Sequence, residues 1–199
     1  LLEKMRIIDQ YALRDLFAFN SEMLDTYNEY DFTAIFHRIG DYSSVNLSTF
    51  YFEIVRDTLY VERANSHERR SVQTAFWYIL DTMTRLMAPI FSFTAEQICD
   101  EYQKNKKESI HLQMFASLHK VAQFIAPHEK LPFDQEYGIT DATRDALRHI
   151  AHNGKQERRW DMLKAMRDAI LKATEGLRET GDIKRSLDAC VICYLVPTS

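Results

Sequence analysis

Three stretches of sequence decide the fold of this chain: LSTFYFEIVRDTLY at residues 47–60, ERRSVQT at residues 68–74 and LMAPIFSFTAEQI at residues 86–98. Their apolar residues recur at intervals of three and four, which is typical of amphipathic helices. Periodicity does not explain why aromatic residues and arginines share one side of the first helix. The Ala88-Pro89 pair disfavours helical geometry at Ala88, so a helix should end there.

The composition indicates a helical protein with one good core. The chain has 199 residues, 46% hydrophobic and 27% charged, with only 5 Gly and 4 Pro. So few breakers favour long helices and argue against an all-β fold. No stretch approaches the roughly 20 apolar residues of a membrane span, and the charged start is unlike a signal peptide. Three cysteines, an odd and low count, favour a cytoplasmic location.

The helical pattern predicts an antiparallel bundle of about five helices, followed by a long helix and one strand. We expect N-caps at Asp31 and Ser66, and a capping box of Thr94 and Gln97. Gly181 should close the long helix. The predicted helices span residues 2–30, 31–45, 46–63, 66–88, 94–102, 140–152 and 155–180, with short extended segments at 109–115 and 186–196.

These elements divide the chain into three parts. Residues 1–116 form the predicted bundle, and residues 117–155 a variable insertion or connector. Residues 156–199 form the long helix and a strand that begins a truncated C-terminal α+β region. The strand is apolar on both faces, so it should need partner strands and cover.

Charge is unevenly distributed although the net charge is only −4. Residues 1–62 carry 5 Lys/Arg and 11 Asp/Glu, whereas residues 144–185 carry 11 and 7. A basic flank could meet phosphate while the rest stays acidic. Solvated helix faces would explain the same numbers.

The predicted helix at residues 46–63 has two distinct sides at about 100° per residue. Its predicted core side carries Leu47, Phe50, Tyr51, Ile54, Thr58 and Val61. Its other side carries Phe52, Arg56, Tyr60 and Arg63. Aromatic rings and guanidinium groups suit unstacked bases and phosphates. Alternatively the helix is covered on both sides, and its arginines pair with Glu53, Asp57 or Glu62.

Arg69 and Arg70 stand at the start of the next predicted helix, close in sequence to Arg63. Arginine gains nothing from the helix dipole at that end, so another anionic partner is expected. That partner is either a phosphate or a carboxylate such as Asp57 or Glu68.

No catalytic, metal or cofactor site is predicted. The sequence lacks Gly-x-Ser-x-Gly and Gly-x-Gly-x-x-Gly, and its 5 scattered glycines offer no phosphate cradle. Cys190 and Cys193 have zinc-like spacing but lie in an apolar run without a second Cys/His pair. We interpret them as small buried residues, with metal binding as the alternative.

The three stretches, in this order and spacing, resemble the anticodon-binding domain of bacterial-type class I isoleucyl-tRNA synthetases. Further likeness comes from Asp9-Gln10-Tyr11-Ala12-Leu13, Tyr30-Asp31-Phe32, Ser109-Ile110-His111-Leu112 and residues 163–195. Valyl and leucyl relatives share the bundle but not this combination of LSTFYFEIVRD and APIFSFTAEQI. The family has Lys-Asp-Arg-Leu-Tyr where this chain has Arg56-Asp57-Thr58-Leu59-Tyr60, so a tRNA role at position 58 is in doubt.

The resemblance implies a non-catalytic part of a larger ligase that joins isoleucine to tRNA(Ile) using ATP and Mg²⁺. Family motifs His-x-Gly-His and Lys-Met-Ser-Lys-Ser are missing here, and Cys190 and Cys193 come too early to be the zinc ligands of the family's far C-terminus. Isoleucine and ATP would bind only in the parent's catalytic domain, with no role for membrane or DNA. The tRNA anticodon stem-loop would contact Arg56, Tyr60, Arg63, Arg69, Arg70, Phe52 and Gln73. The alternative function is a helical protein–protein interaction module.

Overall fold

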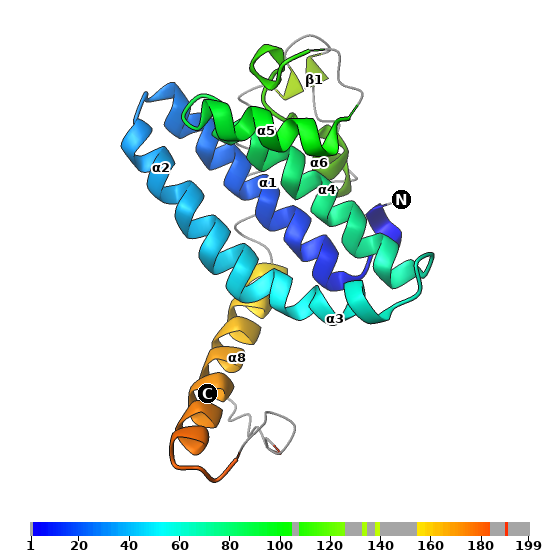
Figure 1. Ribbon diagram of the computed structural model, residues 1–199, viewed down its shortest axis with the longest axis vertical. Helices are drawn as coiled ribbons and strands as arrows, with labels where there is room; N and C mark the ends of the chain where they lie inside the picture. Colours follow the sequence, from blue (N-terminus) through cyan, green and yellow to red (C-terminus); the bar gives the residue numbers. More distant parts are fainter. Residues whose placement is uncertain are drawn as a thin grey trace. The chain divides into compact units, whose positions relative to one another are not determined.

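The computed structural model describes residues 2–104, 108–125, 133–134, 138–139, 155–183 and 190. The chain divides into two compact units, Leu1–His152 and Asn153–Ser199, which are described separately below. The mainly α-helical bundle expected from the sequence is confirmed (Figure 1).

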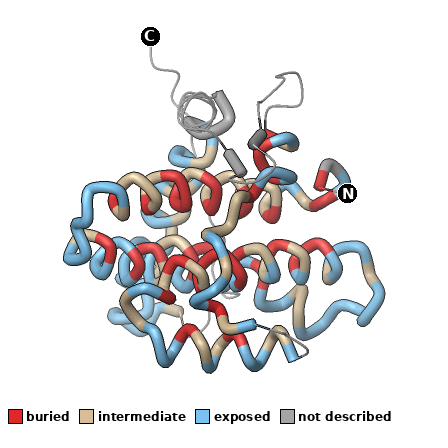
Figure 2. The backbone as a smooth tube through the Cα atoms, turned by 90° about the horizontal axis from the view of Figure 1, so that it is seen from above, coloured by how far each residue is buried: buried red, intermediate tan, exposed pale blue. Residues whose placement is uncertain are grey.

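Helix α1 (Ile7–Asn28) is the centre of the first unit. It packs against α2 (Phe32–Asp41), α4 (His67–Met87) and α6 (His119–Ile125) (Figure 1). Buried residues therefore occupy much of its circumference. Figure 2 colours the described backbone by burial. The largest of its fully buried side chains are Leu13, Leu16, Phe17 and Met23.

The single helix predicted over residues 2–30 is interrupted near its start. A short 3-10 turn, η1 (Leu2–Lys4), precedes α1. Between them Arg6 has an extended backbone (φ −61°, ψ 148°), and its N–H donates to Ser71 Oγ on α4 at 3.0 Å. This long-range hydrogen bond takes the place of a helical one.

The two helices predicted over residues 31–45 and 46–63 are one continuous rod. α2 runs into η2 (Tyr42–Phe52), which is wound as a π-helix, and then into α3 (Glu53–Val61). Asp31 caps the rod as predicted, because its carboxylate accepts from Ala34 N at 2.9 Å. Asn46 starts no new helix, since its side chain instead donates to Asp15 on α1 at 3.0 Å.

The π-helical segment changes which side chains face the core. Consecutive buried positions Tyr42 and Leu47 are five residues apart, which matches i→i+5 winding. The predicted core positions Ile54 and Val61 are consequently 38% and 81% exposed, and Val55 is fully buried instead. A uniform 100° per residue was therefore wrong for this helix.

Helix α4 begins and ends as the sequence predicts. The Ser66 hydroxyl accepts from Arg69 N at 3.2 Å, and the helix ends at Met87, just before Ala88-Pro89. The predicted capping box of the next helix is wrong. α5 (Ser92–Tyr102) begins before Thr94, its N-cap position is Phe91, and no side chain caps it.

The segment after α5 closes the bundle. The predicted extended segment at 109–115 contains a 3-10 turn, η3 (Ile110–Leu112), whose first residue is buried. Glu96 on α5 holds this turn, since it accepts from Ser109 Oγ at 2.7 Å and from Ile110 N at 3.1 Å.

Two short strands, β1 (Phe133–Asp134) and β2 (Gly138–Ile139), pair in antiparallel fashion.

The second unit is described mainly through α8 (Lys155–Glu179), which matches the predicted long helix. Gly181 closes it with φ 82°, and Asp182 N donates to Leu177 O at 3.0 Å, as in a Schellman motif. Cys190 is exposed, so the prediction that it is buried was wrong. The predicted helix at 140–152 and strand at 186–196 lie outside the described residues, apart from Cys190.

Candidate nucleic-acid interface

The expected site residues come from the end of η2, from α3, from the connection that follows it and from the first turns of α4. α3 ends at Val61 and α4 begins at His67, so only a short connection separates them. Tyr60, at the end of α3, is 84% exposed. Its ring is therefore free to meet a planar partner from solvent.

Phe52 lies between the two helices rather than fully on the surface. Its ring centroid is 4.9 Å from that of Phe76 on α4, and the residue is 37% exposed. The sequence offered two readings, a solvent-facing ring or a core ring. The structure matches neither reading fully, because Phe52 contacts Phe76 and is still 37% exposed.

Arg56 is engaged by carboxylates of its own helix. Its Nη1 lies 3.3 Å from Glu53 Oε2, and its Nε lies 3.9 Å from Asp57 Oδ1. This is the pairing that the alternative reading of the helix predicted. Both pairs are exposed, so they are weak and screened by salt. Arg56 nevertheless offers less free positive charge than an arginine without acidic neighbours.

Arg63, Arg69 and Arg70 differ from Arg56 in this respect. Within the described part of the chain, no ion pair joins any of the three to a carboxylate. Arg69 donates through Nη1 to Glu62 O at 3.1 Å and is partly buried. The pairing of Arg69 and Arg70 with Asp57 or Glu68, the alternative to a phosphate partner, is thus not observed.

Arg70 and Gln73 form an exposed polar pair on α4. Arg70 Nη1 donates to Gln73 Oε1 at 3.3 Å, and Nη2 donates to Asn65 Oδ1 at 2.7 Å. Both acceptors are neutral amides, which orient the guanidinium without neutralising it. This arrangement leaves the full charge of Arg70 available to an anion from solvent.

The charge of this part of the chain is balanced overall but unevenly placed. Residues 52–73 contain four arginines and four acidic residues. Two of the acidic residues pair with Arg56 on α3. From Arg69 to Leu80, α4 carries two arginines and no carboxylate. The α4 side is therefore the better phosphate-binding surface.

A buried polar cluster joins the elements that carry the candidate site residues. Asp9 on α1 is fully buried and accepts from Tyr51 Oη at 2.8 Å and Ser71 Oγ at 2.6 Å. Burial, followed by the charge of Asp9, raises the pKa of Tyr51. The cluster links α1, η2 and α4, so it fixes the spacing of the helices that carry the site.

Position 58 has a structural role in this chain. Arg6 Nη1 donates to Thr58 Oγ1 at 2.8 Å, which ties the end of α3 to the start of α1. The Thr58 hydroxyl is thus occupied within the protein. Sequence reasoning also left out Trp77, which is 53% exposed on α4. Its position four residues after Gln73, on the same side of the helix, was the available signal.

The described residues contain no group of three His, Cys, Asp or Glu side chains placed to hold a metal ion. None of the described helices combines the length and apolar character needed to cross a membrane.

The chain belongs to the anticodon-binding domain family of tRNA ligases, whose pattern matches residues 9–193. It is similar to isoleucine–tRNA ligases. That of Syntrophotalea carbinolica is 35% identical over 185 residues, covering 93% of this chain and 17% of that protein. That of Lawsonia intracellularis is 30% identical over 198 residues, covering 98% and 18%. The chain thus spans less than a fifth of the length of these relatives.

Proposed function

We propose that this chain recognises the anticodon stem-loop of tRNA(Ile) as part of an isoleucine–tRNA ligase. The observation that carries the proposal is the family match over residues 9–193, together with relatives that bear this name. The stretch of α4 from Arg69 to Leu80 has no carboxylate and exposes Arg70, Gln73 and Trp77, which supports the proposal with suitable chemistry.

The parent protein would join isoleucine to tRNA in the cytoplasm using ATP and Mg²⁺. The residues of this chain do not fit an ATP site, because its five glycines, at positions 40, 138, 154, 176 and 181, form no glycine-rich loop. We therefore assign the chain to binding only. Isoleucine, ATP and any zinc would be held by other parts of the protein.

The proposed contacts follow from the availability of each side chain. Arg63 and Arg70 hold phosphates, because no ion pair of the described residues engages them. Tyr60 stacks on a base, because its ring is 84% exposed. Arg69, Gln73, Phe52 and Arg56 support these contacts. Arg56 contributes least, because Glu53 and Asp57 share its charge.

The test is binding of the 199-residue chain to the tRNA(Ile) anticodon stem-loop across a salt series, with a valine stem-loop as control. We expect selective binding that weakens steeply with salt, because each neutralised phosphate releases counterions. Replacing Arg69 and Arg70 with Ala should weaken binding by about 1–3 kcal/mol and make the salt dependence shallower.

A matched control is Arg38→Ala, which removes one positive charge from α2, where Arg38 pairs with Glu22 at 3.8 Å. Its affinity should change less than about twofold, since it lies outside the proposed contacts. Unaltered affinity in a folded Arg69→Ala/Arg70→Ala variant would remove the assignment of Arg69 and Arg70. Binding that ignores salt would instead favour a protein–protein interaction module.

A further inference from the structure

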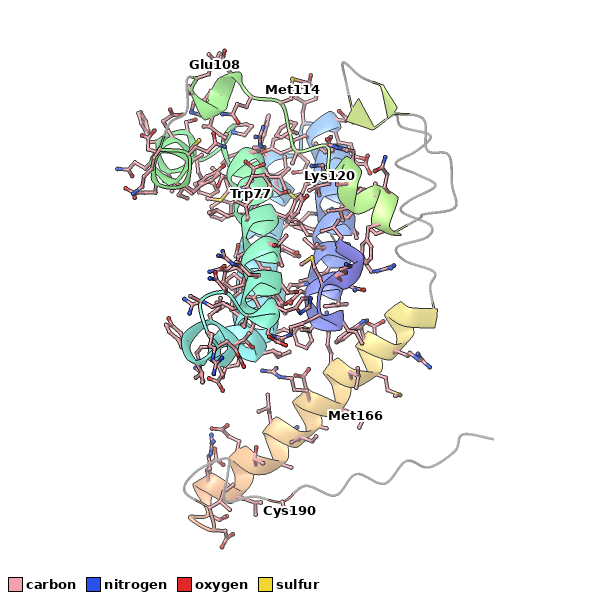
Figure 3. All side chains as sticks on the ribbon, turned by 90° about the vertical axis from the view of Figure 1, so that its right-hand side faces the viewer. Trp77, Glu108, Met114, Lys120, Met166 and Cys190 are labelled. Carbon is pink, nitrogen blue, oxygen red and sulfur yellow. The ribbon has the colours of Figure 1, made fainter. Side chains whose placement is uncertain are left out.

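Trp77 is the most exposed aromatic residue described on α4, and nothing in the proposed contacts uses it. It is 53% exposed, and its ring lies beside that of its neighbour Tyr78, with centroids 5.3 Å apart and an interplanar angle of 83°. Figure 3 labels it on the α4 ribbon. A tryptophan side chain normally buries a large apolar area, so a half-exposed indole is unusual.

The position of Trp77 on the helix explains its exposure. The buried residues Val72, Ala75, Ile79 and Leu86 define the core side of α4, and beyond Trp77 the opposite side is buried too, at Asp81 and Thr84. At about 100° per residue, Trp77 lies opposite the centre of that side. Arg70 lies within about 20° of Trp77, and Gln73 within about 40°. The three side chains therefore share one outward stripe.

The stripe combines the two groups that single-stranded RNA binding requires. Arg70 is oriented by Asn65 and Gln73 but not neutralised by them. Trp77 follows about two helical turns further on, so a charge and a stacking surface lie roughly 10 Å apart along the helix axis. Successive phosphates and bases of an extended strand can use both.

Charge distinguishes this stripe from a second exposed aromatic group among the described residues. Tyr30, Phe32 and Phe36 gather at the α1–α2 turn, where they are 51–76% exposed. Glu29 and Asp31 stand within that turn, so it repels phosphate. By contrast, α4 has no carboxylate between Arg69 and Leu80.

We propose that Trp77 is a stacking residue that receives an unpaired base of the RNA whose phosphates Arg70 holds. This inference rests on the proposed function and adds a binding residue to it. The base packs flat against the indole, which every base can do because each has a π-face. Trp77 therefore contributes affinity more than sequence selectivity.

The experiment compares Trp77→Phe with Trp77→Leu in binding to the tRNA(Ile) anticodon stem-loop. Both substitutions keep an apolar side chain at a half-exposed position, so circular dichroism and thermal unfolding should match the original chain. Leucine cannot stack, and we expect it to weaken binding roughly tenfold, whereas phenylalanine should retain most of the affinity. Phe93→Leu is the control, because it removes a 91% exposed ring from α5.

Fluorescence gives a second readout. The chain has two tryptophans, Trp77 and Trp160. In a Trp160→Phe background, stacking of a base on Trp77 should quench the emission as the stem-loop is added.

The outcomes separate the two proposals. If the original chain binds the stem-loop but Trp77→Leu binds equally well and no quenching occurs, the inference about Trp77 is wrong while the proposed function stands. If the original chain binds no RNA at all, both fail. A shift of Trp77 emission with protein concentration alone would assign the stripe to contact between copies and overturn the inference.

Discussion

At the scale of single residues, the buried carboxylate of Asp9 connects distant parts of the chain. Asp9 comes from α1, yet its oxygens are bound by Tyr51 and Ser71, 42 and 62 residues away. Arg6 Nε lies 3.9 Å from the same carboxylate. These groups are buried together. Removing one of them leaves the others buried without a hydrogen-bond partner, which costs free energy.

Asp9→Asn should therefore be strongly destabilising. An amide keeps one acceptor oxygen and adds two donors, so it cannot accept from both hydroxyls in the present arrangement. We expect the free energy of unfolding to fall by about 2–3 kcal/mol, measured by urea denaturation. The control is Asp57→Asn, whose side chain is 90% exposed and should cost less than about 0.5 kcal/mol. Equal stability of the two variants would contradict the structural role of Asp9.

The helices show which local signals are decisive. Asp31 and Ser66 cap their helices, Pro89 follows the end of α4, and Gly181 closes α8, all as the sequence predicts. Each of these signals acts within one turn of backbone. Thr94 and Gln97 have the spacing of a capping box, yet α5 begins at Ser92. The Phe91 N–H donates to Met87 O at 2.8 Å, so the chain is already turning before Thr94.

A pair of substitutions tests this difference between pattern and structure. Ser66→Ala should lower the free energy of unfolding by about 1 kcal/mol, because Arg69 N loses its acceptor. Thr94→Ala should cost less than about 0.5 kcal/mol, because Thr94 is exposed inside the first turn. Urea denaturation of both variants checks this expectation. A larger loss for Thr94→Ala than for Ser66→Ala would favour the capping box.

The main error among the helices concerned residues 32–61, which were predicted as two helices but form one continuous rod from Phe32 to Val61. The sequence pattern predicted a separate helix from Asn46 onward. Several hydroxyls in the middle bond back to the helix instead, such as Thr49 Oγ1 to Ser44 O at 2.8 Å, five residues earlier. Such bonds compete for helical carbonyls and favour wider turns. The number of residues in the π-helical segment therefore sets the direction in which each later side chain of the rod points.

At the scale of the whole molecule, several tyrosines are buried or half-buried and keep their phenol protons to a higher pH than in water. Burial raises the pKa of Tyr27 to about 12 and that of Tyr42 well above its ordinary value. Tyr51 is raised in the same direction by burial and by Asp9. The unfolded chain loses these protons near pH 10. The folded protein keeps its phenol protons to a higher pH than the unfolded chain does. The stability that comes from these protonated phenols is therefore fully present below the pKa of the unfolded chain and is lost as the pH rises above it.

Stability should therefore fall in alkali. We expect the free energy of unfolding to drop above about pH 10, at up to about 1.4 kcal/mol per pH unit for each phenol concerned. Urea midpoints between pH 8 and pH 11 measure the drop, and Tyr51→Phe should make it shallower. A constant free energy of unfolding over that range would show that these phenols do not stay protonated in the folded protein.

Sequence alone determined the helical class, most helix ends and the region of the candidate site, because these depend on neighbouring residues and on short motifs. It placed Arg56, Tyr60, Arg63, Arg69 and Arg70 near one corner, and that proximity follows from the short connection after α3. Only the tertiary structure decided which of them keep their charge available. Arg56 meets Glu53 and Asp57, whereas Arg70 meets neutral amides. Likewise the burial of Val55 and the exposure of Trp77 depend on winding and on contacts between distant helices, which no local pattern records.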